Sequence, residues 1–155
     1  MPQVVLVEPQ IPPNTGNIAR TCAATNTELH LVGPLGFEIS DRQLKRAGLD
    51  YWPHVDLHQH PSIEKFQAYH ATRSGRWIGF STSGVHNYIH FKFREDDWLL
   101  FGCETSGLPP HVLSMCASTL YIPMSQPHVR SLNLSVSAAV GLFEAHRQLG
   151  RLGSI

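Results

Sequence analysis

Short apolar runs alternate with amphipathic segments along the whole chain. The apolar runs are rich in valine, isoleucine, leucine and aromatic residues and stop at proline, glycine or small polar residues, so they predict buried strands. They lie at residues 3–9, 28–34, 76–84, 96–109 and 119–124. Residues 54–60 are a further candidate strand.

The segments between these runs are typical of helices. We expect helices at residues 14–26, 40–50, 61–71, 110–116 and 133–149. Asn14 or Thr15 would cap the first helix, and Ser40 or Asp41 the second. Pro61 would lie in the first turn of the third.

Alternation of strands and helices predicts an α/β fold with a mostly parallel sheet and helices on both faces. The length suits a single domain over residues 1–155. Ligands of such sheets bind beyond the carboxyl ends of the strands. Loops rich in small residues follow three predicted strands, at 81–84, 102–109 and 123–126, so we expect them to form one pocket.

Composition narrows the class of protein. Hydrophobic residues make up 42% and charged residues 15%, as in a globular protein. No apolar run approaches the length of a membrane span, and no basic segment precedes the first apolar run as in a signal peptide. The chain has an odd number of cysteines: Cys22, Cys103 and Cys116. We expect reduced packing thiols in a cytoplasmic protein that does not associate with a membrane.

The formal net charge is zero, which argues mildly against a nucleic-acid partner. The charges are nevertheless uneven. Arg42, Lys45 and Arg46 lie together, and the last thirty residues carry arginines 130, 147 and 151 against the single acid Glu144. A local basic face is therefore compatible with the neutral total.

The sequence lacks the motifs that mark several common kinds of functional site. The chain contains no GxGxxG, no GxxxxGK[ST] and no GxSxG, so phosphate-loop and nucleophile-elbow chemistry is not indicated. His54, His58 and His60 have loose spacing for a metal site, and we expect strand-face or solvated histidines and no metal.

Five polar residues remain beside the strand ends: Asn14, Arg20, Glu104, Ser131 and Asn133. Singly, each is explained as a helix cap, a surface side chain or a turn residue. Together they belong to three motifs, NTGNIAR (14–20), LFGCETSGLP (100–109), and IPM (122–124) followed by SLNLS (131–135). In this order and spacing, from Val4 to Gly150, the sequence resembles the SPOUT methyltransferases, specifically the TrmH-like 2′-O-ribose methyltransferases.

The resemblance narrows to the short, single-domain members. It rests on EPQIPPNTGNIARTCAAT near the start, GLDYW at 48–52 and EAHRQLG at 144–150. Those members methylate the ribose of the wobble nucleotide, a cytidine or modified uridine, in leucine tRNAs. They use S-adenosyl-L-methionine, release S-adenosyl-L-homocysteine and act as homodimers. The family fold ends in a deep C-terminal trefoil knot, which periodicity cannot reveal.

The resemblance also implies a site. Phe80, Gly102, Ile122 and Ser131 are the positions expected to bind the cofactor. Gly102 would permit close backbone approach, while Phe80 and Ile122 would supply contact surface. Since this cofactor has no phosphates, the missing phosphate loop is expected.

Catalysis should consist mainly of aligning the ribose 2′-oxygen with the methyl carbon. Family proposals make the first-motif arginine, here Arg20, the proton acceptor. A guanidinium group is a poor base, so Arg20 is also expected to hold a tRNA phosphate, to lower the pKa of the hydroxyl, or to pair with Glu104. Asn14, Ser131 and Asn133 would orient these groups.

One departure is Phe143, where relatives can carry a tyrosine, so no role of that hydroxyl is transferred. Two alternatives stay open. The chain could be a related SPOUT enzyme that acts on another tRNA position or on ribosomal RNA. It could also be a catalytically silent RNA- or cofactor-binding protein, although it retains all five polar residues.

Overall fold

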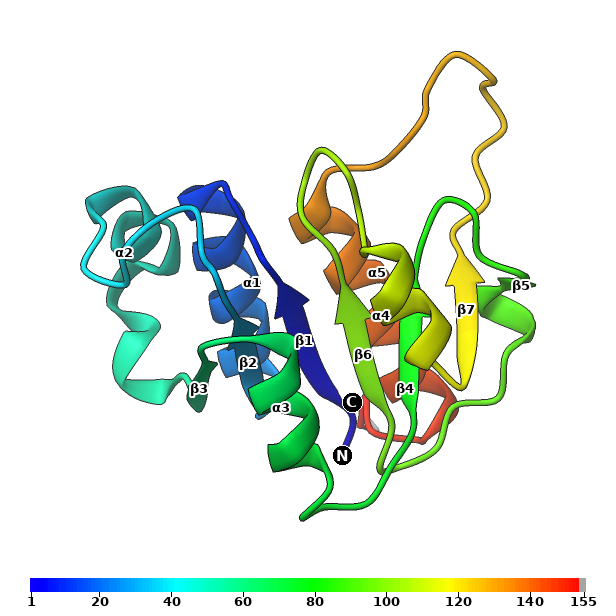
Figure 1. Cartoon of the computed structure of the whole chain (residues 1–155), viewed down its shortest axis with the longest axis horizontal. Helices are drawn as coiled ribbons and strands as arrows, with labels where there is room; N and C mark the ends of the chain where they lie inside the picture. Colours follow the sequence, from blue (N-terminus) through cyan, green and yellow to red (C-terminus); the bar gives the residue numbers. More distant parts are fainter. Residues whose placement is uncertain (154–155) are drawn as a thin grey trace.

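The strands form a single seven-stranded sheet, seen in the computed structural model, which describes residues 1–153 (Figure 1). Every strand pair is parallel, in the order β3-β2-β1-β6-β4-β7-β5. The strands are β1 (Gln3–Val7), β2 (Leu29–Val32), β3 (Leu57–His60), β4 (Trp77–Phe80), β5 (His86–Asn87), β6 (Trp98–Phe101) and β7 (Ser118–Tyr121). The predicted parallel α/β fold is confirmed.

Helices cover both faces of this sheet. They are α1 (Pro12–Ala24), α2 (Arg42–Gly48), α3 (Ile63–His70), α4 (Pro110–Met115) and α5 (Leu134–Gln148), with 3₁₀ turns η1 (Leu49–His54) and η2 (Tyr88–His90). Along β1, Val4 and Leu6 pack in the core that contains residues of α1 and α5. Val5 and Val7 pack in the core that contains residues of α3 and α4. This follows from the two-residue period of a strand.

Two expected helix starts are wrong. Helix α1 begins at Pro12, one residue after Ile11, which provides no side-chain cap. Proline fits this position because its missing N–H would lack a helical partner there. Asn14 is therefore inside the helix and buried, not a cap. Likewise, α3 is capped by the hydroxyl of Ser62, which leaves Pro61 outside the helix. Asp41 caps α2 as expected.

Strand β5 and both 3₁₀ turns were not predicted. Each is shorter than the window over which periodicity can be read, and β5 has only two residues. Among residues 1–153, no helix has the length and apolar character needed to cross a membrane.

The strand order decides where the loops meet. Strands β6, β4 and β7 are neighbours, so the loops after their carboxyl ends leave the same edge of the sheet. Figure 1 shows these loops at the upper edge, with the long segment between β7 and α5 rising above the others. The strand pairing does not decide whether this segment is knotted, so the trefoil knot stays a prediction.

Candidate functional site

A cavity of about 410 Å³ lies where these three loops meet the start of α5. Such a volume is within the range of small-molecule sites. Phe80, Gly102, Ile122 and Ser131 all line it. The prediction that the three strand-end loops share one pocket is confirmed, and the four expected cofactor positions are on its wall.

Phe80 forms part of this wall because two neighbours fix its ring. The ring stacks on Phe101, with 4.7 Å between centroids and 18° between planes. At the tip of the ring lies Gly141 of α5, where an added Cβ would be 2.6 Å from the Phe80 ring. A side chain at position 141 would therefore push Phe80 toward Phe101 or the cavity.

The loop after β6 closes tightly on itself. A Cβ at Gly102 would lie 2.0 Å from the carbonyl carbon of Gly107, so only glycine fits this backbone approach. Gly107 has a φ of 69°, in the left-handed region, and its N–H donates to the Cys103 carbonyl at 3.0 Å. The loop thus turns its polar residues 103–106 along the cavity wall.

Glu104 ties this loop to the start of α1. Its two carboxylate oxygens accept hydrogen bonds from the backbone N–H groups of Gln10 and Ile11, at 2.9 and 3.0 Å. Within residues 1–153 of one chain, no ion pair joins Glu104 to Arg20. Glu104 is therefore a structural link between two of the three motifs that also lines the cavity.

The cysteines differ in their surroundings, and no disulfide joins them in the described part of the chain. Cys22 is a buried packing residue, and burial raises the pKa of its thiol. Burial also raises the pKa of Cys116, to about 11. Cys103 was expected to be a packing thiol but lines the cavity. Burial acts to raise its pKa, yet hydrogen bonding with Ser106, 2.8 Å away, holds that pKa below its ordinary value.

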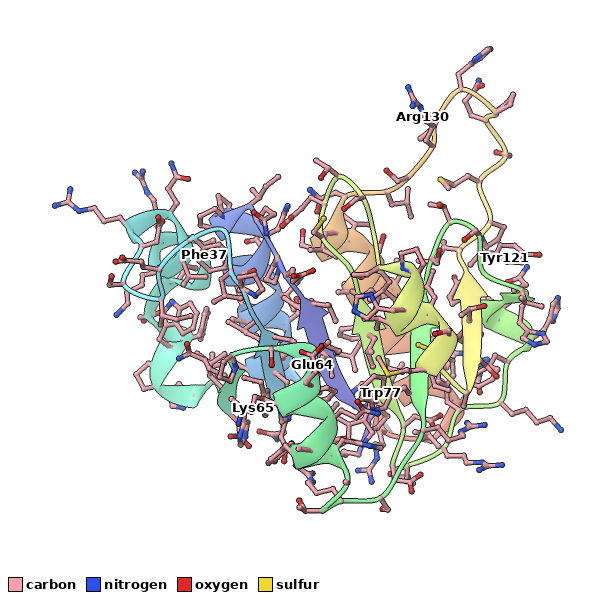
Figure 2. The ribbon with its side chains drawn as sticks, in the orientation of Figure 1. Phe37, Glu64, Lys65, Trp77, Tyr121 and Arg130 are labelled. Atoms are coloured by element: carbon pink, nitrogen blue, oxygen red, sulfur yellow. The ribbon has the colours of Figure 1, made fainter. Side chains whose placement is uncertain are left out.

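The segment between β7 and α5 brings the third motif to the cavity. Ser131 and Arg130 line it, and Figure 2 shows Arg130 on the raised loop at the top of the molecule. Asn133 caps α5 by accepting from the N–H of Ser135 at 2.8 Å. Its amide also donates to the side-chain oxygen of Asn14 at 3.0 Å. The end of this loop is thereby fixed to α1.

Of the five polar candidates, Glu104 and Ser131 line the cavity, whereas Asn14, Asn133 and Arg20 do not. Asn14 and Asn133 bond to each other beside the start of α5, and Arg20 lies apart from both. Its side chain is exposed on α1, and its guanidinium carbon lies 5.5 Å from the ring centroid of Tyr51 in η1. Sequence reasoning gave Tyr51 no role, although it noted the GLDYW motif that contains it. The hydroxyl groups lining the cavity were also missed: Ser81, Thr82, Ser83, Thr105, Ser106 and Ser137. The sequence feature that could have identified these hydroxyl groups is the run of small polar residues after the strands.

The donor set of the cavity fits an uncharged or cationic ligand without phosphates. Hydroxyl groups and apolar side chains alternate along the wall, including Leu120, Ile122 and Leu134. Arg130 is the one lysine or arginine among the lining residues that the structure describes. A phosphate site would instead collect several cations or helix N-termini. An adenosine group could rest on the apolar wall, with its polar atoms toward hydroxyls and backbone.

A histidine cluster lies at the β2–β3 edge, away from this cavity. The ring of His30 is nearly parallel to those of His58 and His60, with planes 12° and 14° apart. Both ring nitrogens of His30 already have hydrogen-bond partners, since Nδ1 lies 2.9 Å from His60 Nε2 and Nε2 lies 2.9 Å from a Glu28 carboxylate oxygen. Ligand atoms of Glu28, His30 and His58 do lie within 4.8 Å of one another, but Arg73 already binds the Glu28 carboxylate at 2.8 Å. The cluster is better explained as a hydrogen-bonded stack.

The sheet is all-parallel, and a cavity that depends on close backbone approach at glycine lies beyond the ends of three strands. These features define a ligand-binding α/β protein, the class that includes enzymes with nucleotide or other cofactors. The chain belongs to the SpoU rRNA methylase family, whose model matches residues 1–143. A relative from Synechocystis sp. is 59% identical over 153 residues, covering 99% of this chain and 100% of its own. One from Polaromonas sp., named tRNA (cytidine(34)-2′-O)-methyltransferase, is 46% identical and covers 97% and 93%.

Solved structures agree with this assignment. One, described as giving structural insights into the 2-OH methylation of C/U34 on tRNA, has a TM-score of 0.92 and 51% identity, with 97% of each chain covered. Another is the SpoU methyltransferase AviRb from Streptomyces viridochromogenes in complex with the cofactor AdoMet. It has a TM-score of 0.84 and 26% identity, and covers 96% of this chain and 57% of its own.

Proposed function

We propose that this protein transfers a methyl group from S-adenosyl-L-methionine to the ribose 2′-hydroxyl of wobble nucleotide 34, a cytidine or modified uridine of leucine tRNAs. Two findings support this substrate: the name of the Polaromonas relative and the solved structure concerned with C/U34. The observation that carries the proposal is the meeting of Phe80, Gly102, Ile122 and Ser131 in one cavity. The reaction needs no membrane, and we place it in the cytoplasm, where tRNA is modified.

The cavity residues would hold the cofactor, which supplies an electrophilic methyl carbon on a sulfonium sulfur. Phe80 and Ile122 offer apolar surface to an adenine ring. At Gly102 the absence of a side chain exposes backbone to the ligand, and Ser131 offers a hydroxyl. The AviRb complex with AdoMet supports this choice of cofactor, and S-adenosyl-L-homocysteine is the expected product. No residue in this arrangement requires a metal.

Catalysis in this proposal is mainly alignment. As the oxygen–carbon bond forms, the carbon–sulfur bond breaks, and the hydroxyl proton must leave. Glu104 holds the loop after β6 against the start of α1, and Asn133 fixes the start of α5 to Asn14. These bonds keep the cavity wall rigid while the ribose is in place. Arg20 would act on the ribose hydroxyl or its phosphate, since a guanidinium is suited to binding anions and poorly suited to accepting protons.

Because Arg20 does not line the cavity of its own chain, we infer that the protein acts as a homodimer in which Arg20 serves the cavity of the partner subunit. The surface next to the motifs supports such an assembly. Leu132, Val136 and Phe143 follow a helical spacing at the start and along the outer side of α5, and their side chains are exposed. Ile11, at the start of α1, is also exposed. An apolar stripe of this kind is typical of a protein–protein interface.

The tRNA backbone would bind the basic side of α2. Arg42, Lys45 and Arg46 are exposed and take part in no ion pair within residues 1–153. In contrast, Arg147 and Arg151 are paired with Glu144 and Glu95, which neutralises the basic C-terminal region expected from the sequence. Phosphate contacts by unpaired cations supply affinity without sequence specificity.

The test uses methyl-labelled cofactor and tRNA from a strain that lacks this activity, followed by nucleoside analysis. Label in a 2′-O-methylated cytidine or uridine derivative at position 34 of leucine tRNAs is the expected result. Label at another tRNA position or in ribosomal RNA would replace the wobble assignment with the related-enzyme alternative. Cofactor binding without any RNA labelling would indicate a catalytically silent binding protein and overturn the proposal.

A further inference from the structure

The GLDYW segment forms a rigid connection at the end of α2. Gly48 ends the helix, and a Cβ there would lie 2.4 Å from the indole nitrogen of Trp52, so the indole rests directly on the glycine. The same indole N–H donates to the Lys45 carbonyl at 3.2 Å. Leu49 turns the chain with a φ of 53°. These contacts fix η1 against the last turn of α2.

Helices α1 and α2 are themselves in backbone contact. A Cβ at Gly16 would lie 2.3 Å from the Leu44 carbonyl oxygen and 2.6 Å from the Ala47 Cβ. Such close approach leaves the two helices little freedom to move separately. A residue of η1 is therefore held at a constant place relative to the outer face of α1.

Tyr51 is the residue of η1 that faces Arg20. The guanidinium carbon lies 5.5 Å from the ring centroid, within the usual range of a cation–π contact. Within residues 1–153, the side chain of Arg20 makes no hydrogen bond or ion pair. Without the ring, its long side chain would be free to sample many rotamers in solvent.

We propose that Tyr51 is a positioning residue for Arg20: its ring holds the guanidinium in the orientation needed at the ribose. This inference rests on the proposed function of Arg20. The function of the GLDYW segment would then be to place an aromatic face beside the arginine of the first motif. The phenolic hydroxyl has no part in it, because the attraction comes from the ring face.

Four variants separate this role from others: Tyr51→Phe, Tyr51→Leu, Arg20→Ala and the Arg20→Ala/Tyr51→Leu double variant. Tyr51→Phe keeps the ring and should methylate tRNA at the wild-type rate. Tyr51→Leu should lower kcat about two- to fivefold, the range that an exposed cation–π contact supports, with KM for the cofactor unchanged. In the Arg20→Ala background, Tyr51→Leu should cause no further loss. Leu49→Ala, on the same exposed turn, is the matched control.

A second measurement does not depend on turnover. The Nε–H resonance of Arg20 should carry a ring-current shift that disappears in Tyr51→Leu and persists in Tyr51→Phe. Melting temperatures of all variants show whether they fold.

Several outcomes would overturn the inference. If the effect of Tyr51→Leu on kcat or on KM for tRNA added fully to that of Arg20→Ala, the ring would act on the RNA independently of Arg20. If Arg20→Ala were slow while Tyr51→Leu matched the wild type, this inference would fail and the proposed role of Arg20 would stand. A fully active Arg20→Ala variant would refute both.

Discussion

The side-chain amide of Asn133 donates a hydrogen bond to the side-chain oxygen of Asn14 across 3.0 Å. The two residues are 119 positions apart, one at the cap of α5 and the other inside α1. This bond joins the third motif to the first and satisfies a polar group that is 7% exposed. Asn133 therefore serves two purposes, since its oxygen caps α5 while its nitrogen binds Asn14.

The two purposes of Asn133 can be separated by substitution. Asn133→Ser should keep the cap, because serine is a good capping residue, and should be destabilised less than Asn133→Ala, because it loses only the bond to Asn14. It should lose the bond to Asn14 and slow methylation. Asn133→Ala should lose both and be destabilised by about 1 kcal/mol or more. Urea unfolding and methylation rates check this, and an equally active Asn133→Ser variant would show that the bond to Asn14 is dispensable.

Glu104 should be more important for its two acceptor oxygens than for its charge alone. In Glu104→Gln one oxygen becomes an amide nitrogen, which cannot accept from the Gln10 or Ile11 N–H group. Both bonds are exposed, so water can take the place of the lost acceptor, and the change costs about 0.5–1.5 kcal/mol. We expect a lower free energy of unfolding and slower methylation.

Glu64→Gln, at an exposed position on α3, is the control for removing a carboxylate. Wild-type stability of Glu104→Gln in denaturant titrations would contradict the structural role of Glu104.

Substitution of Gly141 should disturb the cavity through Phe80. In Gly141→Ala the new methyl group would overlap the Phe80 ring, which is already stacked on Phe101. Overpacking of this kind costs about 1–3 kcal/mol, and the displaced ring should weaken binding of S-adenosyl-L-homocysteine in calorimetry. The Gly141→Ala/Phe80→Leu double variant makes room for the methyl group and should recover stability. Unchanged ligand affinity in Gly141→Ala would separate Phe80 from the cofactor site.

Acid should destabilise the protein through His30. Burial lowers the pKa of this fully buried side chain from an ordinary 6.5 to about 4. Between these two pH values His30 binds a proton in the unfolded chain but not in the folded chain. The free energy of unfolding therefore falls as pH decreases from 6.5 to about 4. The full effect amounts to about 3 kcal/mol at 1.36 kcal/mol per pKa unit.

Replacing His30 with glutamine should make this pH dependence shallower. Some dependence should remain, because burial also lowers the pKa of His60. Urea unfolding at several pH values measures the slope, with His128→Gln in the exposed loop as the control. An unchanged slope in His30→Gln would mean that another group controls the acid sensitivity.

Local pattern in the sequence was sufficient for the main elements and for the expectation that three strand-end loops share a pocket. Strand β1 is apolar from Val4 to Val7 because both faces of the sheet are covered, and small residues follow the strands where backbone must approach closely. Phe80, Gly102, Ile122 and Ser131 were assigned through the resemblance to a known family, whose motifs are short stretches of sequence. Each depends on a few neighbouring residues.

Tertiary structure decided which of these residues touch. In the folded chain, the Glu104 oxygens accept hydrogen bonds from the backbone N–H groups of Gln10 and Ile11, and Arg20 lies beside Tyr51. Tertiary structure also aligned His30 with His58 across neighbouring strands. Burial and helix capping are encoded by nearby side chains, whereas partners across the fold depend on strand order and helix packing. Those arise only when the whole chain buries its apolar surface at once.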